Sequence, residues 1–222
     1  MRASIDMAGT SRSTDAVDFA ALIGHAAWHR LHPAIRRRFR VGHAASPVRY
    51  PGRLRFERNG AGLVFALLSK LCGGPLPTAC DREWPAVVTV ADDGAGGVIW
   101  DRSIRPDDGP VRTIRSVKRV DSRGRLLECV RGGLGMVLTV CERDGALVFA
   151  SRRYFLALGP LRLPLPHLLT PGRCEVTHRD EGGGRFRFTL SMRHPLWGAT
   201  FDQTGLFEDP DDRPGAAPGR RS

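Results

Sequence analysis

Strand-length segments follow one another from Trp84 to Phe207, with short turn clusters between most of them. The clearest of them lies at 185–193, where four apolar side chains alternate with polar ones: Phe186, Phe188, Leu190 and Met192. Such alternation is typical of a strand with one buried and one solvated face. Because no helix-length segment separates these strands, neighbours should pair in antiparallel fashion. A sheet with so many strands tends to curl or close.

We expect about nine strands on such patterns. They are 48–57, 84–91, 98–104, 125–131, 135–142, 146–156, 173–179, 185–193 and 197–207. A further segment, Val111–Val120, carries valine or isoleucine at every third position, which fits either a helix or a bulged strand. Asp144-Gly145 predicts a tight hairpin turn.

Two or three helices should accompany the sheet. Thr14-Asp15 can cap a helix over Ala16–Leu31. A short helix over Ala34–Phe39 should follow, and we expect its run Arg36-Arg37-Arg38 to be solvated. Ala61–Cys72 predicts a helix that is apolar almost all round, which must be buried or lie against something apolar. The segment Gly159–Pro171 is apolar too, but it is too rich in proline for a central strand.

These elements predict one mainly β (α+β) domain over residues 15–208. We expect a curved antiparallel sheet or half-barrel with the N-terminal helices packed on the sheet. A length of 222 residues suits a single all-β domain. Residues 1–14 and 209–222 are small, polar or rich in Pro and Gly, so two disordered tails are expected.

The cysteines and the hydropathy pattern bear on location. The five cysteines are odd in number and none has C-x-x-C spacing, which disfavours a disulfide framework or a zinc ribbon. The longest apolar run, Ala61–Leu68, is far shorter than the roughly 20 residues that span a bilayer. Residues 1–14 lack the apolar core of a signal peptide. We therefore expect a cytoplasmic protein without a transmembrane segment.

The net charge of +11 raises the question of an acidic partner. The charge is spread over the body of the chain, and 32 of the 34 basic residues are arginine, so a coding bias explains it as well as function does. A generic basic surface is the simplest interpretation, ahead of an anionic ligand or membrane surface. Nucleic acid is disfavoured as a partner, because the basic residues are not gathered in a tail.

The order of motifs resembles the bacterial family known as domain of unknown function 4166. The resemblance covers most of residues 17–208. It rests on FAALIGHAAWHRLHPAIRRRF, RYPGRLRFERNGAGLVFALLSKL, WDRSI, GPLRLPLPHLLTP and FRFTLSMRHPLWGATFDQTGLF. Phe201 stands where the family leads us to expect a tyrosine. Some members are fused to NAD(P)-binding oxidoreductase or epimerase domains, so the resemblance implies an accessory or binding domain with no assigned activity.

Several kinds of chemistry are disfavoured. The cluster Gly132-Gly133-Leu134-Gly135 leads into a strand, whereas a dinucleotide fingerprint must open a helix. Asp92-Asp93 and Asp107-Asp108 are carboxylate pairs in turns, where a structural role is expected. No P-loop is present.

Two constellations leave an alternative open. His25 and His29, four residues apart with His32 beyond them, could bind a metal, but no acidic or thiol ligand is adjacent and an exposed helix face explains them equally. Lys118-Arg119 pairs a lysine with a second cation, which lowers the pKa of an amine and favours Schiff-base formation. Both side chains could equally be solvated strand positions.

The apolar segments favour ligand binding. A curved sheet with a hydrophobic concave face can enclose a small molecule, and the helix 61–72 and the loop 158–171 could cover its mouth. The candidate ligand-binding residues are Trp84, Trp100, Arg102, Arg153, Tyr154, His167 and Trp197. The aromatic members could line the site, or could simply fill a core. One of the two arginines could bind an anionic head group.

We therefore expect noncatalytic binding of an apolar or amphipathic small molecule, without a cofactor or a metal. The alternative is an accessory domain that docks on an NAD(P)-dependent oxidoreductase or on a membrane surface. An enzyme is the third class, because the sequence contains no complete catalytic constellation.

Overall fold

The computed structural model describes residues 16–40, 46–71, 76–78, 82–107, 109–159 and 161–210. The expected tails fall almost wholly outside these ranges. The helices are α1 (Phe19–Ile23), α2 (His25–Arg30), α3 (Pro33–Arg38), α4 (Gly60–Leu71) and the 3₁₀ helix η2 (His167–Leu169). The strands are β1 (Val48–Arg58), β2 (Arg82–Asp92), β3 (Val98–Ile104), β4 (Arg112–Val120), β5 (Leu126–Val130), β6 (Leu134–Arg143), β7 (Ala146–Leu158), β8 (Leu161–Leu165), β9 (Arg173–Gly182), β10 (Arg185–His194) and β11 (Gly198–Glu208). In the described ranges, no helix has both the length and the apolar character needed to cross a membrane.

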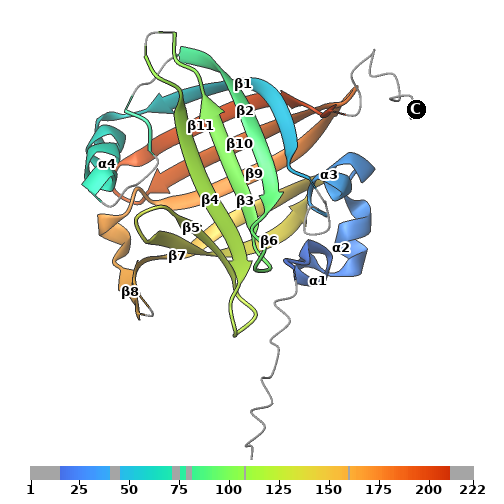
Figure 1. The fold of residues 1–222 in the computed structure, drawn as a ribbon. Helices are drawn as coiled ribbons and strands as arrows, with labels where there is room; N and C mark the ends of the chain where they lie inside the picture. Colours follow the sequence, from blue (N-terminus) through green and yellow to red (C-terminus); the bar gives the residue numbers. More distant parts are fainter. Residues whose placement is uncertain are drawn as a thin grey trace, which may run out of the picture.

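Ten of the strands form a closed antiparallel barrel (Figure 1). Their order is β6-β5-β4-β3-β2-β1-β11-β10-β9-β7, and the pairing of β6 with β7 joins the two ends of this order. The expectation of an open half-barrel is therefore wrong, although the mainly β, antiparallel class is confirmed. Strand β7 makes closure possible because its 13 residues pair with β6 along one edge and with β9 and β8 along the other.

The ambiguous and proline-rich segments are both strands in part. The segment at 111–120 forms β4, which pairs with β3 and β5, so the helical alternative is wrong. The proline-rich segment contributes β8 and η2, and β8 pairs only with β7. This edge position tolerates Pro164, as expected, because proline cannot donate to a second neighbour. Asp144-Gly145 forms the β6–β7 turn with positive φ at both residues, 51° and 76°, as a type I′ turn requires.

The N-terminal helices close one end of the barrel. The helix expected over 16–31 is broken into α1 and α2 at Gly24, whose φ of 85° is accessible to glycine and ends the first helix. Phe19 and Phe39 reach the aromatic interior, where the Phe39 ring lies 5.3 Å from Trp100 and 5.7 Å from Phe149. These contacts join the helices and the barrel in one core.

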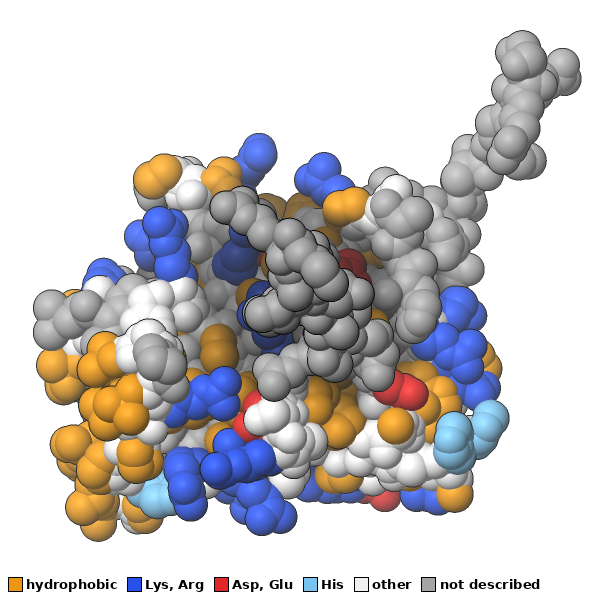
Figure 2. Space-filling model, turned by 60° about the horizontal axis from the view of Figure 1, so that its bottom comes forward, with side chains coloured by type: hydrophobic (Ala, Val, Ile, Leu, Met, Phe, Trp, Pro, Cys, Tyr) orange, Lys and Arg blue, Asp and Glu red, His pale blue; other side chains and the backbone are white. Residues whose placement is uncertain are grey.

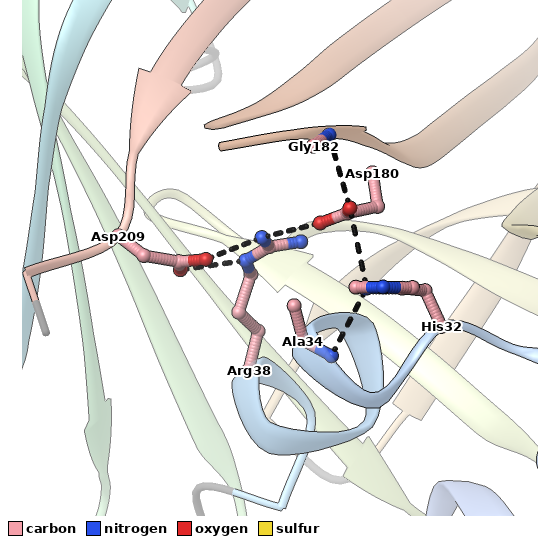
Figure 3. Close-up of polar contacts among 6 residues, drawn as sticks. All are labelled: His32, Ala34, Arg38, Asp180, Gly182 and Asp209. Carbon is pink, nitrogen blue, oxygen red and sulfur yellow. Dashed lines mark hydrogen bonds and ion pairs between the residues drawn. The ribbon is translucent and has the colours of Figure 1, made fainter. Parts of the chain in front are cut away.

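Arg38 corrects the expectation that the arginine run of α3 is solvated. Its side chain is only 3% exposed and donates to both carboxylate oxygens of Asp209, from Nε at 2.8 Å and from Nη2 at 2.5 Å (Figure 3). Nη2 also donates to Asp180 Oδ1 at 2.9 Å, and the guanidinium lies 4.2 Å from the Phe186 ring centre. Asp209, placed in the C-terminal tail on sequence grounds, is thus a buried part of the fold.

Candidate functional site

The opposite end of the barrel from α1–α3 carries α4, β8 and η2 (Figure 1). A cavity of about 240 Å³ opens there between α4 and the η2 segment. Its lining is almost entirely apolar. The lining residues are Phe65, Leu68, Ser69, Leu76, Glu128, Val130, Leu134, Gly135, Met136, Tyr154, Leu165, Leu169, Thr170, Pro171 and Met192.

Helix α4 is held close to the barrel by its first turn. Asn59 caps the helix, because its Oδ1 accepts from the Gly62 amide at 2.8 Å and its Nδ2 donates to the Trp197 carbonyl at 2.8 Å. Gly62 lies directly against the backbone carbonyl of Thr200, and a Cβ at this position would collide with it. The helix therefore packs on β11 at backbone distance, which aims Phe65 and Ser69 at the cavity.

The opposite wall is fixed by side-chain hydrogen bonds to the backbone. The Tyr154 hydroxyl donates to the Gly172 carbonyl at 2.8 Å, and Thr170 Oγ1 donates to the His167 carbonyl at 2.7 Å. The Thr200 hydroxyl bonds to the Pro171 carbonyl. Burial is the main reason that the pKa of Tyr154 is raised well above its usual value, so this phenol remains a hydrogen-bond donor.

Glu128 is the one charged side chain among the residues that line the cavity. It is paired with Lys118 on the neighbouring strand, at 3.1 Å from Nζ to Oε1, and Arg102 Nη2 lies 3.9 Å away. Burial acts to raise the pKa of Glu128, but the attraction of Lys118 and Arg102 outweighs it and lowers this pKa. Glu128 is thus a carboxylate at neutral pH and can accept a hydrogen bond from a molecule in the cavity.

Lys118 continues the polar cluster into the barrel. Its ammonium group lies 5.2 Å from the Trp100 ring centre and 5.3 Å from that of Phe149. Its pKa is lowered mainly by burial and also by Arg102, against the opposing attraction of Glu128. The cation close to Lys118 is therefore Arg102. Arg119, its neighbour in the sequence, points outward and pairs with Asp93.

Deeper in the barrel the concave face is filled. His178 lies among aromatic rings, including Phe39 at 4.9 Å and Phe188 at 5.3 Å between ring centres. The gap beside it measures about 10 Å³, which is room for a single water molecule at most. His178 Nδ1 and Trp100 Nε1 are buried without a hydrogen-bond partner among the described residues. The barrel interior is thus filled towards α1–α3, and the cavity lies towards α4.

The sequence-based candidates divide between these regions. Tyr154 lines the cavity and Arg102 stands behind Glu128. Trp84 and Trp100 belong to the filled core. Three candidates lie outside the cavity: His167 and Arg153 are exposed, and Trp197 stacks on His194 at 4.1 Å beside α4.

Glu128 was missed by sequence reasoning. The available signal was a single acid within the apolar segment Leu126–Val130, on the same strand face as Leu126. An acid on an inward face needs a buried partner. Lys118 provides it, but only the strand register shows that the two residues are opposite each other.

The histidines of α2 and its flank have other neighbours. His29 Nδ1 lies 3.2 Å from Arg36 Nη1, and His32 Nδ1 lies 3.2 Å from Asp180 Oδ2. Across the described part of the chain, no three His, Cys, Asp or Glu side chains gather as a metal site would require.

A larger hollow of about 810 Å³ lies on the outer surface of β4 and β5. Two of its arginines already pair with carboxylates: Arg115 with Asp101, at 2.5 Å, and Arg119 with Asp93, at 2.5 Å. Some of its other lining side chains, such as Val117 and Leu127, point away from the barrel interior. The cavity beside α4 is therefore the better candidate site.

Comparison with known proteins places the chain in a family. The family model described as Domain of unknown function (DUF4166) matches residues 31–207, which is more than half of the chain. The chain belongs to this family. No curated protein matches it. Among solved structures, the crystal structure of Rv2717c from M. tuberculosis is similar at 13% sequence identity and a TM-score of 0.41, over 81% of this chain and 98% of that chain.

Proposed function

We propose that this member of the family binds a small amphipathic molecule in the cavity beside α4. The observation that carries the proposal is an apolar cavity with one ionised carboxylate, Glu128, on its lining. Ligand sites commonly combine an apolar lining with a few polar groups that fix orientation. The cavity, at about 240 Å³, is slightly below the usual range of about 300–1,000 Å³, which favours a medium-length chain over a large ring system.

The polar end of the ligand should carry a hydrogen-bond donor. Glu128 is charged and accepts hydrogen bonds, whereas Lys118 and Arg102 lie on the far side of it and are not on the cavity lining. An alcohol or an ammonium group can therefore bond to Glu128, while a carboxylate in the same place would be repelled. This differs from the anionic head group expected from the arginines alone.

Calorimetric titration with decanol, decylamine and decanoate tests this proposal, because the three share one chain length. We expect decanol and decylamine to bind more tightly than decanoate. Tightest binding by decanoate would contradict the role of Glu128.

A pocket-filling variant tests the location. Ser69→Phe adds a ring inside the cavity and removes only a local bond, since Ser69 Oγ donates to the Ala66 carbonyl of the same helix at 2.9 Å. Val64→Phe adds similar bulk to α4 at an exposed position that does not line the cavity. We expect Ser69→Phe to abolish decanol binding and Val64→Phe to preserve it, with both variants melting near the wild-type temperature. Equal binding by all three proteins would place the ligand elsewhere.

A further inference from the structure

The rim of the cavity exposes many large apolar side chains, which we call the mouth patch. They come from α4, β8, η2 and the β10–β11 turn. The members are Val64, Leu67, Leu68, Leu161, Leu163, Leu168, Leu169, Leu196 and Trp197. Figure 2 shows hydrophobic side chains gathered on the side of the molecule where α4 and β8 lie in Figure 1. Exposed apolar surface on this scale marks an interaction site.

The patch is continuous with the cavity. Leu68 and Leu169 line the cavity, yet they are 54% and 70% exposed, so they form its mouth. The Trp197 ring lies 5.5 Å from that of Phe65, which also lines the cavity, and this contact joins the β10–β11 turn to α4. A molecule that leaves the cavity therefore enters an apolar surface rather than open water.

The segments that build the mouth patch are rich in basic residues. Segments 60–71, 145–174 and 192–200, which build this end, contain no Asp or Glu, so all 23 acidic residues lie elsewhere. The same segments carry six basic residues, all with exposed side chains: Lys70, Arg152, Arg153, Arg162, Arg173 and Arg193. With six basic and no acidic residues, these segments carry +6 of the overall +11, and one of the six, Arg162, is paired with Asp121 at 3.5 Å.

We infer that the mouth patch docks on the surface of an anionic lipid bilayer. Leucine and tryptophan side chains can enter the boundary between head groups and acyl chains, while arginine and lysine stay at the level of the lipid phosphates. The amphipathic ligand then passes between the bilayer and the cavity through the mouth at Leu68 and Leu169. This last step rests on the proposed function.

Vesicle flotation of the full chain tests the docking. The probes are vesicles of phosphatidylcholine alone and vesicles that also contain phosphatidylglycerol. We expect flotation only with the anionic vesicles, and less of it as salt is raised, because salt screens the attraction between the arginines and the lipid phosphates.

The variant Leu67→Gln/Leu168→Gln removes two leucines of the patch without touching the cavity lining or the charge. We expect its vesicle partition coefficient to fall by about tenfold or more, since each leucine loses its burial in lipid. Val120→Gln is the matched control, because Val120 is also exposed but lies at the end of β4, outside the mouth patch. This control should float as the wild type does.

Three results would overturn the docking inference. The wild type could fail to float with anionic vesicles at low salt, or the double variant could float as well as Val120→Gln does. Sedimentation could also show a wild-type dimer that the double variant disperses, in which case a second copy of the chain covers the patch. Failure of the proposed ligand binding can be told apart from failure of membrane docking, because Ser69→Phe should lose decanol binding and still float with the anionic vesicles.

Discussion

The buried ion cluster at Arg38 predicts an unusually large effect for a residue near the end of the chain. Asp209→Ala leaves the Arg38 guanidinium buried with a single hydrogen bond, from Nη2 to Asp180 at 2.9 Å. Removing one partner of a buried pair typically costs about 3–5 kcal/mol. Because Asp180 remains, we expect a loss of about 3 kcal/mol in the free energy of unfolding.

Urea-induced equilibrium unfolding measures this loss, and Glu83→Ala is the control. Glu83 pairs with Arg53 at 3.0 Å, but both side chains are more than half exposed, so this pair should contribute about 0–1 kcal/mol. The two ion pairs differ chiefly in burial, since Arg38 and Asp209 are buried whereas Arg53 and Glu83 are exposed. Equal losses in the two variants would refute the role of burial.

Three further predictions concern the barrel interior and the thiols. The pKa of His178 is held well below 6.5, mainly by burial, so below pH 6.5 the unfolded chain binds a proton that the folded chain does not. The free energy of unfolding should therefore fall as the pH drops below 6.5, and His178→Phe should weaken this dependence in urea titrations. Lys118→Met leaves Glu128 buried with only Arg102, at 3.9 Å, as a cation and should cost about 3 kcal/mol, more than the double change Lys118→Met/Glu128→Leu, as urea midpoints would show. Burial raises the pKa of Cys174 to about 12, so iodoacetamide should modify the exposed Cys141 while Cys174 stays unmodified in the native protein, as peptide mass spectrometry would detect.

Local patterns predicted the strands well because side-chain alternation and turn chemistry depend on adjacent residues. The segment 185–193 and the Asp144-Gly145 turn are examples. Closure of the barrel was not predictable in this way. It depends on the pairing of β6 with β7 while β7 also pairs with β9 and β8, and no local pattern encodes that.

The candidate site shows the same division. The apolar helix and the proline-rich segment were expected to border a site, and both line the cavity. The polar groups were harder to find, because Glu128 meets Lys118 only through strand register. The ion pairs of Arg38 were harder still to predict, because its partners Asp180 and Asp209 lie 142 and 171 residues further along the chain. Long-range ion pairs leave no periodicity in the sequence.

The central claim is that an amphipathic molecule occupies the cavity with its polar end at Glu128. Crystals soaked with a decanol brominated at the far end of its chain test it directly, because bromine scatters anomalously. We predict an anomalous peak near the mouth, between Leu68 and Leu169, and a hydroxyl oxygen within hydrogen-bond distance of the Glu128 carboxylate. A bound molecule with its bromine elsewhere, or a cavity that stays empty while decanol binds in solution, would contradict the account.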